Sequence, residues 1–234
     1  MRWPALAKRR QVLLPTAMGW LLIAGLLSAG LARAWRGVFP FLAVQEPADA
    51  SILVVEGWMD REGLDQAFEL ARQGDYARVV TTGGPIESWP ERIGCASYAE
   101  LAADYLLQLG LPPAQVSSFP APASAQERTF LSAIEVRDRL RAEGADVRAL
   151  DIFSWGCHAR RTRLLYRLAF GPGVEIGIRS AASSRFGTSD WWRSSAGAKS
   201  VLQESIALLW TELFFWPPEP GSHAERWAVE AGAH

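Results

Sequence analysis

A chain of 234 residues, of which 49% are hydrophobic and 21% charged, is long enough for one buried core and too short for two ordinary domains plus a membrane anchor. Its 24 basic and 25 acidic residues nearly cancel, so the positive field that steers proteins onto nucleic acid is missing and we expect no nucleic-acid partner. The two cysteines, Cys95 and Cys157, are too few for a disulfide scaffold and match no zinc spacing, so no metal site is predicted. A single bridge between them stays open.

The N-terminal segment has the pattern of a membrane anchor. Residues 1–11 carry four basic side chains, and residues 12–32 contain no charge. Twenty-one helical residues rise roughly 31 Å, which matches the hydrocarbon core of a bilayer. We therefore predict a transmembrane signal-anchor helix over residues 12–34, which makes the membrane the first expected partner.

The charges on both sides of this span set its expected orientation. Four basic residues precede it and two, Arg33 and Arg36, follow it, so the positive-inside tendency puts residues 1–11 in the cytoplasm. The prediction is a single-pass protein of the cytoplasmic (inner) membrane with its domain in the periplasm or outside. A cleaved signal peptide is the alternative, because Ala32-Arg33-Ala34 resembles a small-x-small cleavage site.

Beyond a linker over residues 35–50, short β-branched runs alternate with segments of helical period, which is typical of repeated βαβ units. The predicted fold class is α/β, a Rossmann-like three-layer sandwich with a mostly parallel sheet over residues 51–217. Residues 218–234 read as a disordered tail. The expected strands are 51–55, 78–82, 115–119, 148–154 and 174–179.

The sequence also predicts the N-termini of three helices and an apolar face on the last helix. Asp60 is an expected N-cap, and Ser97 with Glu100, like Ser124 with Glu127, has the spacing of a capping box. The last helix carries a broad apolar face, which we expect to pack on the sheet, with a membrane-surface helix as the alternative. Its members are Val201, Leu202, Ile206, Leu209, Trp210, Leu213 and Phe214.

Ligands of open parallel sheets bind outside the carboxyl ends of the strands, so the residues that end or follow the strands are the candidate ligand-binding residues. Glycine turns there let backbone amides approach an anion, although tight turns need glycine in any case. The third helix adds a basic and hydroxyl cluster on one face, and the loop over residues 85–94 is long enough to act as a lid. The candidates are Glu56, Gly57, Thr82, Gly83, Gly84, Ser154, Arg128, Thr129 and Ser132.

His158 and Arg161 complete the predicted site. They lie three residues apart in the first turn of a helix, so both can reach one point, while Arg160 faces the other way. An imidazole and a guanidinium at a helix N-terminus suit a phosphate or carboxylate, and these two are the candidate catalytic residues. The alternative is a solvated basic helix face with an incidental histidine.

Several of these segments resemble the YdcF-like family, also called domain of unknown function 218, which includes SanA-like and ElyC-like envelope proteins. The resemblance covers about residues 51–217 and rests on ILVVEGW (52–58), VVTTGG (79–84), RTFLSA (128–133), CHARR (157–161), DWWR (190–193) and Glu204. It implies a Rossmann-like fold, frequent membrane anchoring and a role in bacterial cell-envelope biogenesis. Neither a reaction nor a cofactor follows from it.

The leading functional hypothesis is an envelope protein that binds an anionic or phosphate-bearing ligand, such as a lipid-linked cell-wall precursor, with processing of that ligand left open. A non-catalytic scaffold or partner-binding domain is the first alternative. The second is a hydrolase in which Cys157, at a strand-to-helix turn, has its pKa lowered by the helix N-terminus and by basic neighbours.

Overall fold

The computed structural model describes residues 14–86, 94–183 and 186–227. The chain divides into two units, Met1–Val38 and Phe39–His234, and each is described by itself.

The first unit contains most of helix α1, Ala17–Leu42, which is long and apolar enough to cross a membrane. The helix begins later than the predicted residue 12, because Pro15 and Thr16 precede it and the Thr16 hydroxyl accepts a hydrogen bond from the Gly19 amide. It also ends later, since the predicted linker is helical up to Leu42 despite Pro40. Phe39 and Leu42 are buried in the second unit, and this packing stabilises the last turn. The basic segment 1–11 lies outside the described residues.

The second unit is built on a parallel sheet, and all five predicted strands are present within two residues of their expected bounds. They are β1 Ile52–Glu56, β2 Arg78–Gly83, β3 Val116–Pro120, β4 Ala149–Trp155 and β5 Glu175–Ala181. The strand order is β3-β2-β1-β4-β5, and every neighbouring pair is parallel. This confirms the predicted α/β, Rossmann-like class.

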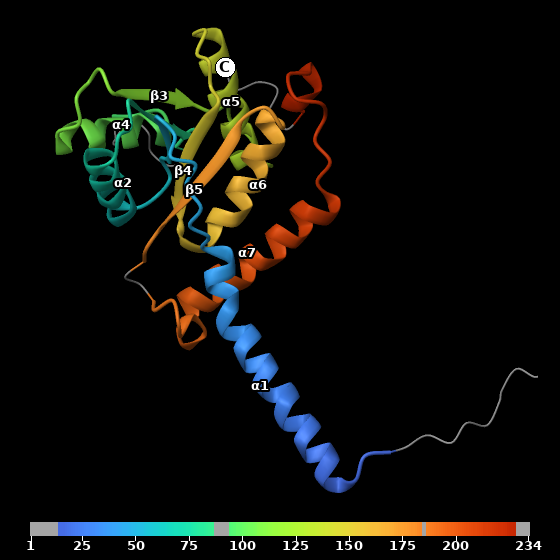
Figure 1. The fold of residues 1–234 in the computed structure, drawn as a ribbon. Helices are drawn as coiled ribbons and strands as arrows, with labels where there is room; N and C mark the ends of the chain where they lie inside the picture. Colours follow the sequence, from blue (N-terminus) through green and yellow to red (C-terminus); the bar gives the residue numbers. More distant parts are fainter. Residues whose placement is uncertain (1–13, 87–93, 184–185, 228–234) are drawn as a thin grey trace, which may run out of the picture. The chain divides into compact units, whose positions relative to one another are not determined.

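Helices cover both faces of the sheet (Figure 1). Helices α2, Arg61–Gln73, and α4, Tyr98–Leu109, pack against one face. Helices α5, Arg128–Ala142, and α6, Ala159–Phe170, pack against the other, where they bury the larger apolar core. The result is the expected three-layer arrangement.

Two of the three predicted helix starts are correct. The Asp60 side chain caps α2 at the Gly63 amide, and Ser97 with Glu100 forms the predicted capping box of α4. The predicted box at Ser124 is wrong, because the N-cap of α5 is three residues later, at Glu127, which has a positive φ of 51°. The Ser124 hydroxyl bonds to the backbone of Gln126 instead, a local turn that competes with capping.

Helix α7, Ser195–Phe214, does not pack its apolar face on the sheet. Its buried large side chains are Val201, Glu204, Leu208 and Thr211, which form a narrow stripe on the side facing the domain. Both faces of the sheet are already covered by the four other helices, so α7 lies outside the three layers and packs against α6. The prediction of a sheet-packing face is therefore wrong.

The segment after residue 217 is ordered up to Trp227, contrary to the predicted disordered tail. It contains a 3₁₀ turn, His223–Arg226, whose Glu225 is fully buried and pairs with the buried Arg137 of α5. A buried ion pair needs fixed partners on both sides, so this turn is part of the domain. Residues 228–234 lie outside the described part of the chain.

Candidate functional site

The strand order places a cavity where ligands of doubly wound sheets bind. Strands β1 and β4 are neighbours, and the helices that follow them lie on opposite faces, so a crevice opens at their carboxyl ends. A cavity of about 1280 Å³ lies there. Nine of the eleven predicted binding residues line it: Glu56, Thr82, Gly83, Gly84, Arg128, Thr129, Ser132, His158 and Arg161.

The two other predicted residues, Gly57 and Ser154, lie behind the cavity wall. A Cβ atom on Gly57 would stand 2.3 Å from the carbonyl oxygen of Tyr98, so this glycine is needed for close packing of α4. Gly83, with φ of 152°, is also packed against Tyr98. The buried Ser154 hydroxyl donates a hydrogen bond to the Glu56 carboxylate and so fixes it at the end of β1.

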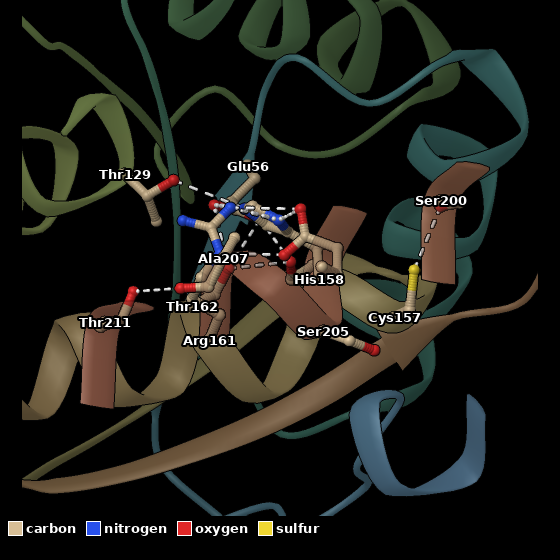
Figure 2. Close-up of polar contacts among 12 residues, drawn as sticks. Glu56, Thr129, Cys157, His158, Arg161, Thr162, Ser200, Ser205, Ala207 and Thr211 are labelled. Atoms are coloured by element: carbon tan, nitrogen blue, oxygen red, sulfur yellow. Dashed lines mark hydrogen bonds and ion pairs between the residues drawn. The ribbon is translucent and has the colours of Figure 1, made fainter. Parts of the chain in front are cut away.

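His158 and Arg161 converge on one carboxylate, as their three-residue spacing predicts (Figure 2). His158 Nδ1 lies 2.9 Å from Glu204 Oε1, and Arg161 Nε lies 2.9 Å from Glu204 Oε2. Arg161 Nη2 is also 3.0 Å from Nδ1, but a guanidinium cannot accept a hydrogen bond. We therefore assign the Nδ1 proton to the bond with Glu204.

The other ring nitrogen of His158 points toward the cavity. Its Nε2 lies 3.4 Å from the Thr129 hydroxyl and 3.9 Å from Glu56 Oε1 (Figure 2). The ring of Trp58 stands edge-on to the imidazole, with the centroids 5.1 Å apart. With the Nδ1 proton donated to Glu204, Nε2 of the neutral ring is the nitrogen that can accept a hydrogen bond, and the Thr129 hydroxyl lies beside it.

The surroundings shift the pKa values of two carboxyl groups of the cavity, those of Glu204 and Glu127. Burial by itself raises the pKa of Glu204, but the hydrogen bonds and charges of His158 and Arg161 outweigh it and lower that pKa to about 2. Burial raises the pKa of Glu127, while the charge of Arg161 opposes this rise. Glu204 thus stays ionised at neutral pH and holds both basic side chains.

Glu204 is expected to stabilise the domain in a pH-dependent way. Its pKa is lowered from 4.5 to about 2, and one pKa unit corresponds to about 1.4 kcal/mol, so the ionised form adds about 3 kcal/mol to the free energy of unfolding. A depressed carboxyl pKa stabilises above the unfolded value, so this contribution is present above pH 4.5 and is lost as the pH falls toward 2. Chemical unfolding of wild type and Glu204→Gln should differ most at neutral pH and converge in acid. A difference that stays constant between pH 7 and pH 3 would contradict the ion-pair interpretation.

Helix α5 brings its predicted cluster to the same cavity. Arg128, Thr129 and Ser132 all line it, and Arg128 Nε donates to the Ser124 carbonyl, 2.9 Å away. Arg128 and Thr129 lie in the first turn of the helix, where backbone amides and the helix dipole favour an anion, and Ser132 lies in the second turn. The predicted convergence of this cluster with His158 is therefore observed.

Other basic residues of α6 lie elsewhere. Arg160 donates to the Phe41 carbonyl and its guanidinium lies over the Phe41 ring, 3.9 Å from the centroid. Arg163 donates to the Ile176 carbonyl and pairs with Glu46. Arg160 therefore holds the last turn of α1, and Arg163 holds the segment that follows it. Arg161 differs from both in facing the cavity, as predicted for its contrast with Arg160.

Cys157 does not have the environment of a nucleophile. It is buried, does not line the cavity and lies 3.1 Å from the Ser200 hydroxyl. Burial raises the pKa of its thiol, which is the opposite of the predicted lowering. Cys95 and Cys157 are both free thiols, so the bridge left open does not form.

The sequence-based prediction missed part of the site. Glu204 entered only through the family resemblance, and the apolar wall formed by Ile206 and Trp210 of α7 was not expected. Within the described ranges, no group of three or more His, Cys, Asp or Glu side chains is arranged to hold a metal ion. The proposed lid falls mostly on residues 87–93, which lie outside the described residues.

No protein-family model and no curated protein sequence matches this chain.

Proposed function

We propose that this is a membrane-anchored, extracytoplasmic protein of bacterial cell-envelope biogenesis that binds a phosphate-bearing ligand and processes it by proton transfer at His158. The observation that carries the proposal is the Glu204–His158 pair: Glu204 holds Nδ1, and Nε2, beside the Thr129 hydroxyl, faces a cavity that also contains Arg161 and Arg128. A histidine held by a carboxylate through Nδ1 is suited to act as a general base through Nε2.

The charges around the cavity favour a ligand with more than one kind of polar group. Arg128 and Arg161 offer guanidinium donors, which suit phosphate oxygens. Glu56 and Glu127 offer carboxylate acceptors, which suit sugar or other hydroxyl groups. This combination supports a phosphorylated, hydroxyl-bearing compound, and the apolar wall of α7 suits a lipid attached to it.

The proposed reaction is hydrolysis of a phosphate ester or anhydride. Nε2 of His158 takes a proton from a water molecule, and the water oxygen forms a bond to phosphorus. The phosphorus bond to the leaving oxygen breaks, and that oxygen receives the proton from Nε2. Arg161 and Arg128 stabilise the charge on the phosphoryl oxygens.

The membrane part of the proposal rests on α1 and on the sequence resemblance. Helix α1 is apolar and long enough to cross a bilayer, and the basic residues 1–11 favour a cytoplasmic N-terminus. The resemblance to the YdcF-like family supports an envelope role. A membrane-tethered domain meets lipid-linked precursors at the surface where they occur.

Binding of phosphate-bearing probes tests this function. We expect the full chain in detergent micelles to bind pyrophosphate and farnesyl diphosphate, and Arg128→Ala to weaken both about tenfold or more, because a hydrogen bond to a charged group contributes about 1.5–3 kcal/mol. Isothermal titration calorimetry gives the dissociation constants.

Arg148→Ala is the matched control, since it removes the same charge from an exposed side chain before β4, at the end of the sheet away from the cavity. Equal effects of the two substitutions would contradict the anion site. No binding of any phosphate compound by wild type would favour the scaffold alternative.

A further inference from the structure

Helix α7 presents an apolar face to the outside of the domain. Its large side chains are between 43% and 70% exposed, and Trp216, just after the helix, is 82% exposed. They recur at intervals of three and four residues and therefore share one side of the helix. They are Leu202, Ile206, Leu209, Trp210, Leu213 and Phe214.

This face is nearly free of charge. From Val201 to Trp216 the charged residues are Glu204, which is buried in the cavity wall, and Glu212, which is exposed. Lys199 lies in the second turn of the helix, before this stretch. A contiguous apolar face of this size on a soluble domain normally contacts another surface.

The position of α7 in the domain indicates which surface that is. Residues 39–42, the end of the membrane-span candidate, belong to the globular unit, where Phe39 and Leu42 are buried. The Phe39 ring packs edge-on against Phe186, with centroids 5.8 Å apart, and Phe186 contacts Gly197 in the first turn of α7. Within the globular unit, the last turn of α1 therefore lies beside the start of α7.

We infer that the outward face of α7 lies in the interfacial layer of the bilayer that α1 spans. Residues 39–42, which end the proposed span, lie beside the start of α7 within the globular unit, so the bilayer is a surface within reach of this face. Trp210 and Trp216 are the residue type enriched at membrane interfaces, and Lys199 suits lipid phosphates. This inference rests on the proposed membrane span of α1 and does not depend on the ligand of the cavity.

Depth-dependent quenching tests the inference in the full chain. A Leu209→Cys substitution in a Cys95→Ser background accepts a nitrobenzoxadiazole label, because the remaining Cys157 is buried. After reconstitution into phosphatidylethanolamine and phosphatidylglycerol vesicles, we expect a lipid-attached nitroxide to quench the label. Aqueous iodide should quench it severalfold less than a label on the matched control Glu69→Cys, an exposed position of α2.

Two results would overturn the inference. Iodide quenching at position 209 equal to that at position 69, with no effect of the lipid nitroxide, would show that the face is in water. Protection from both quenchers would show that protein covers it, and cross-linking would then identify a second copy of the chain.

Discussion

His158→Gln should lower the turnover of a phosphate-bearing substrate by about 10²–10⁴-fold, the usual contribution of a positioned general base. A glutamine amide can donate to Glu204 as the Nδ1 proton does, so the ion pair between Glu204 and Arg161 keeps its surroundings. The amide has no basic nitrogen at the place of Nε2, which lies 3.4 Å from Thr129. Phosphate release in single-turnover experiments measures the chemical step directly.

The binding measurement separates catalysis from recognition. His158→Gln should bind pyrophosphate within a few-fold of wild type, since Arg128 and Arg161 remain. Arg148→Ala should keep wild-type turnover, because its exposed side chain pairs with Asp146 away from the cavity. Wild-type turnover by His158→Gln would show that the histidine has only a structural role. Binding without any turnover by wild type would leave a binding protein.

Glu225→Ala should lower the free energy of unfolding by about 3 kcal/mol, because it removes the fully buried partner of a buried guanidinium, which keeps the partly exposed carboxylate of Asp138 as its ion-pair partner. Arg137 and Glu225 are each 1% exposed in their side chains, and two hydrogen bonds of 2.7 Å join them. Glu225 also accepts a hydrogen bond from the Gly221 amide, 2.7 Å away. Denaturant unfolding of the full chain in micelles gives the difference.

Arg226→Ala is the control for this prediction. Arg226 is 40% exposed and pairs with Glu135 and Asp138 at the rim of the same turn, so its loss should cost about 1 kcal/mol or less. The free energy of unfolding of Glu225→Ala could instead lie within about 1 kcal/mol of the wild-type value, which is far less than breaking a buried pair costs. That result would show that the segment 218–227 is not held against α5 in solution.

Strands β1, β2 and β4 could be predicted because each contains a short apolar run that is buried in the sheet. The edge strand β3, of which only Phe119 is buried, was placed by the alternation of strands and helices along the chain. The order of the strands could not be predicted, since several orders bury the same runs equally well. The convergence of His158 and Arg161 followed from helical spacing alone. Glu204 lies 43 residues after Arg161 and reaches it only through the packing of α7 on α6, which no local pattern encodes.

The errors have a common physical origin. An apolar helix face has the same sequence pattern whether it packs on a sheet or is exposed, so the face of α7 was assigned to the wrong neighbour. The segment 218–227 has few apolar residues, and the pair Arg137–Glu225 that fixes it joins positions 88 apart. Both outcomes depend on tertiary contacts rather than on local preference.

Ile206 and Trp210 belong to two surfaces at once, because they line the cavity and are also 70% and 43% exposed on the outward face of α7. A molecule that covers that face therefore touches the rim of the cavity. If covering the face changes the affinity of the cavity, an occupied cavity must change the affinity of the face by the same factor. Detergent monomers bound along α7 would act as allosteric effectors, so affinities measured in micelles should vary with the detergent's alkyl chain length.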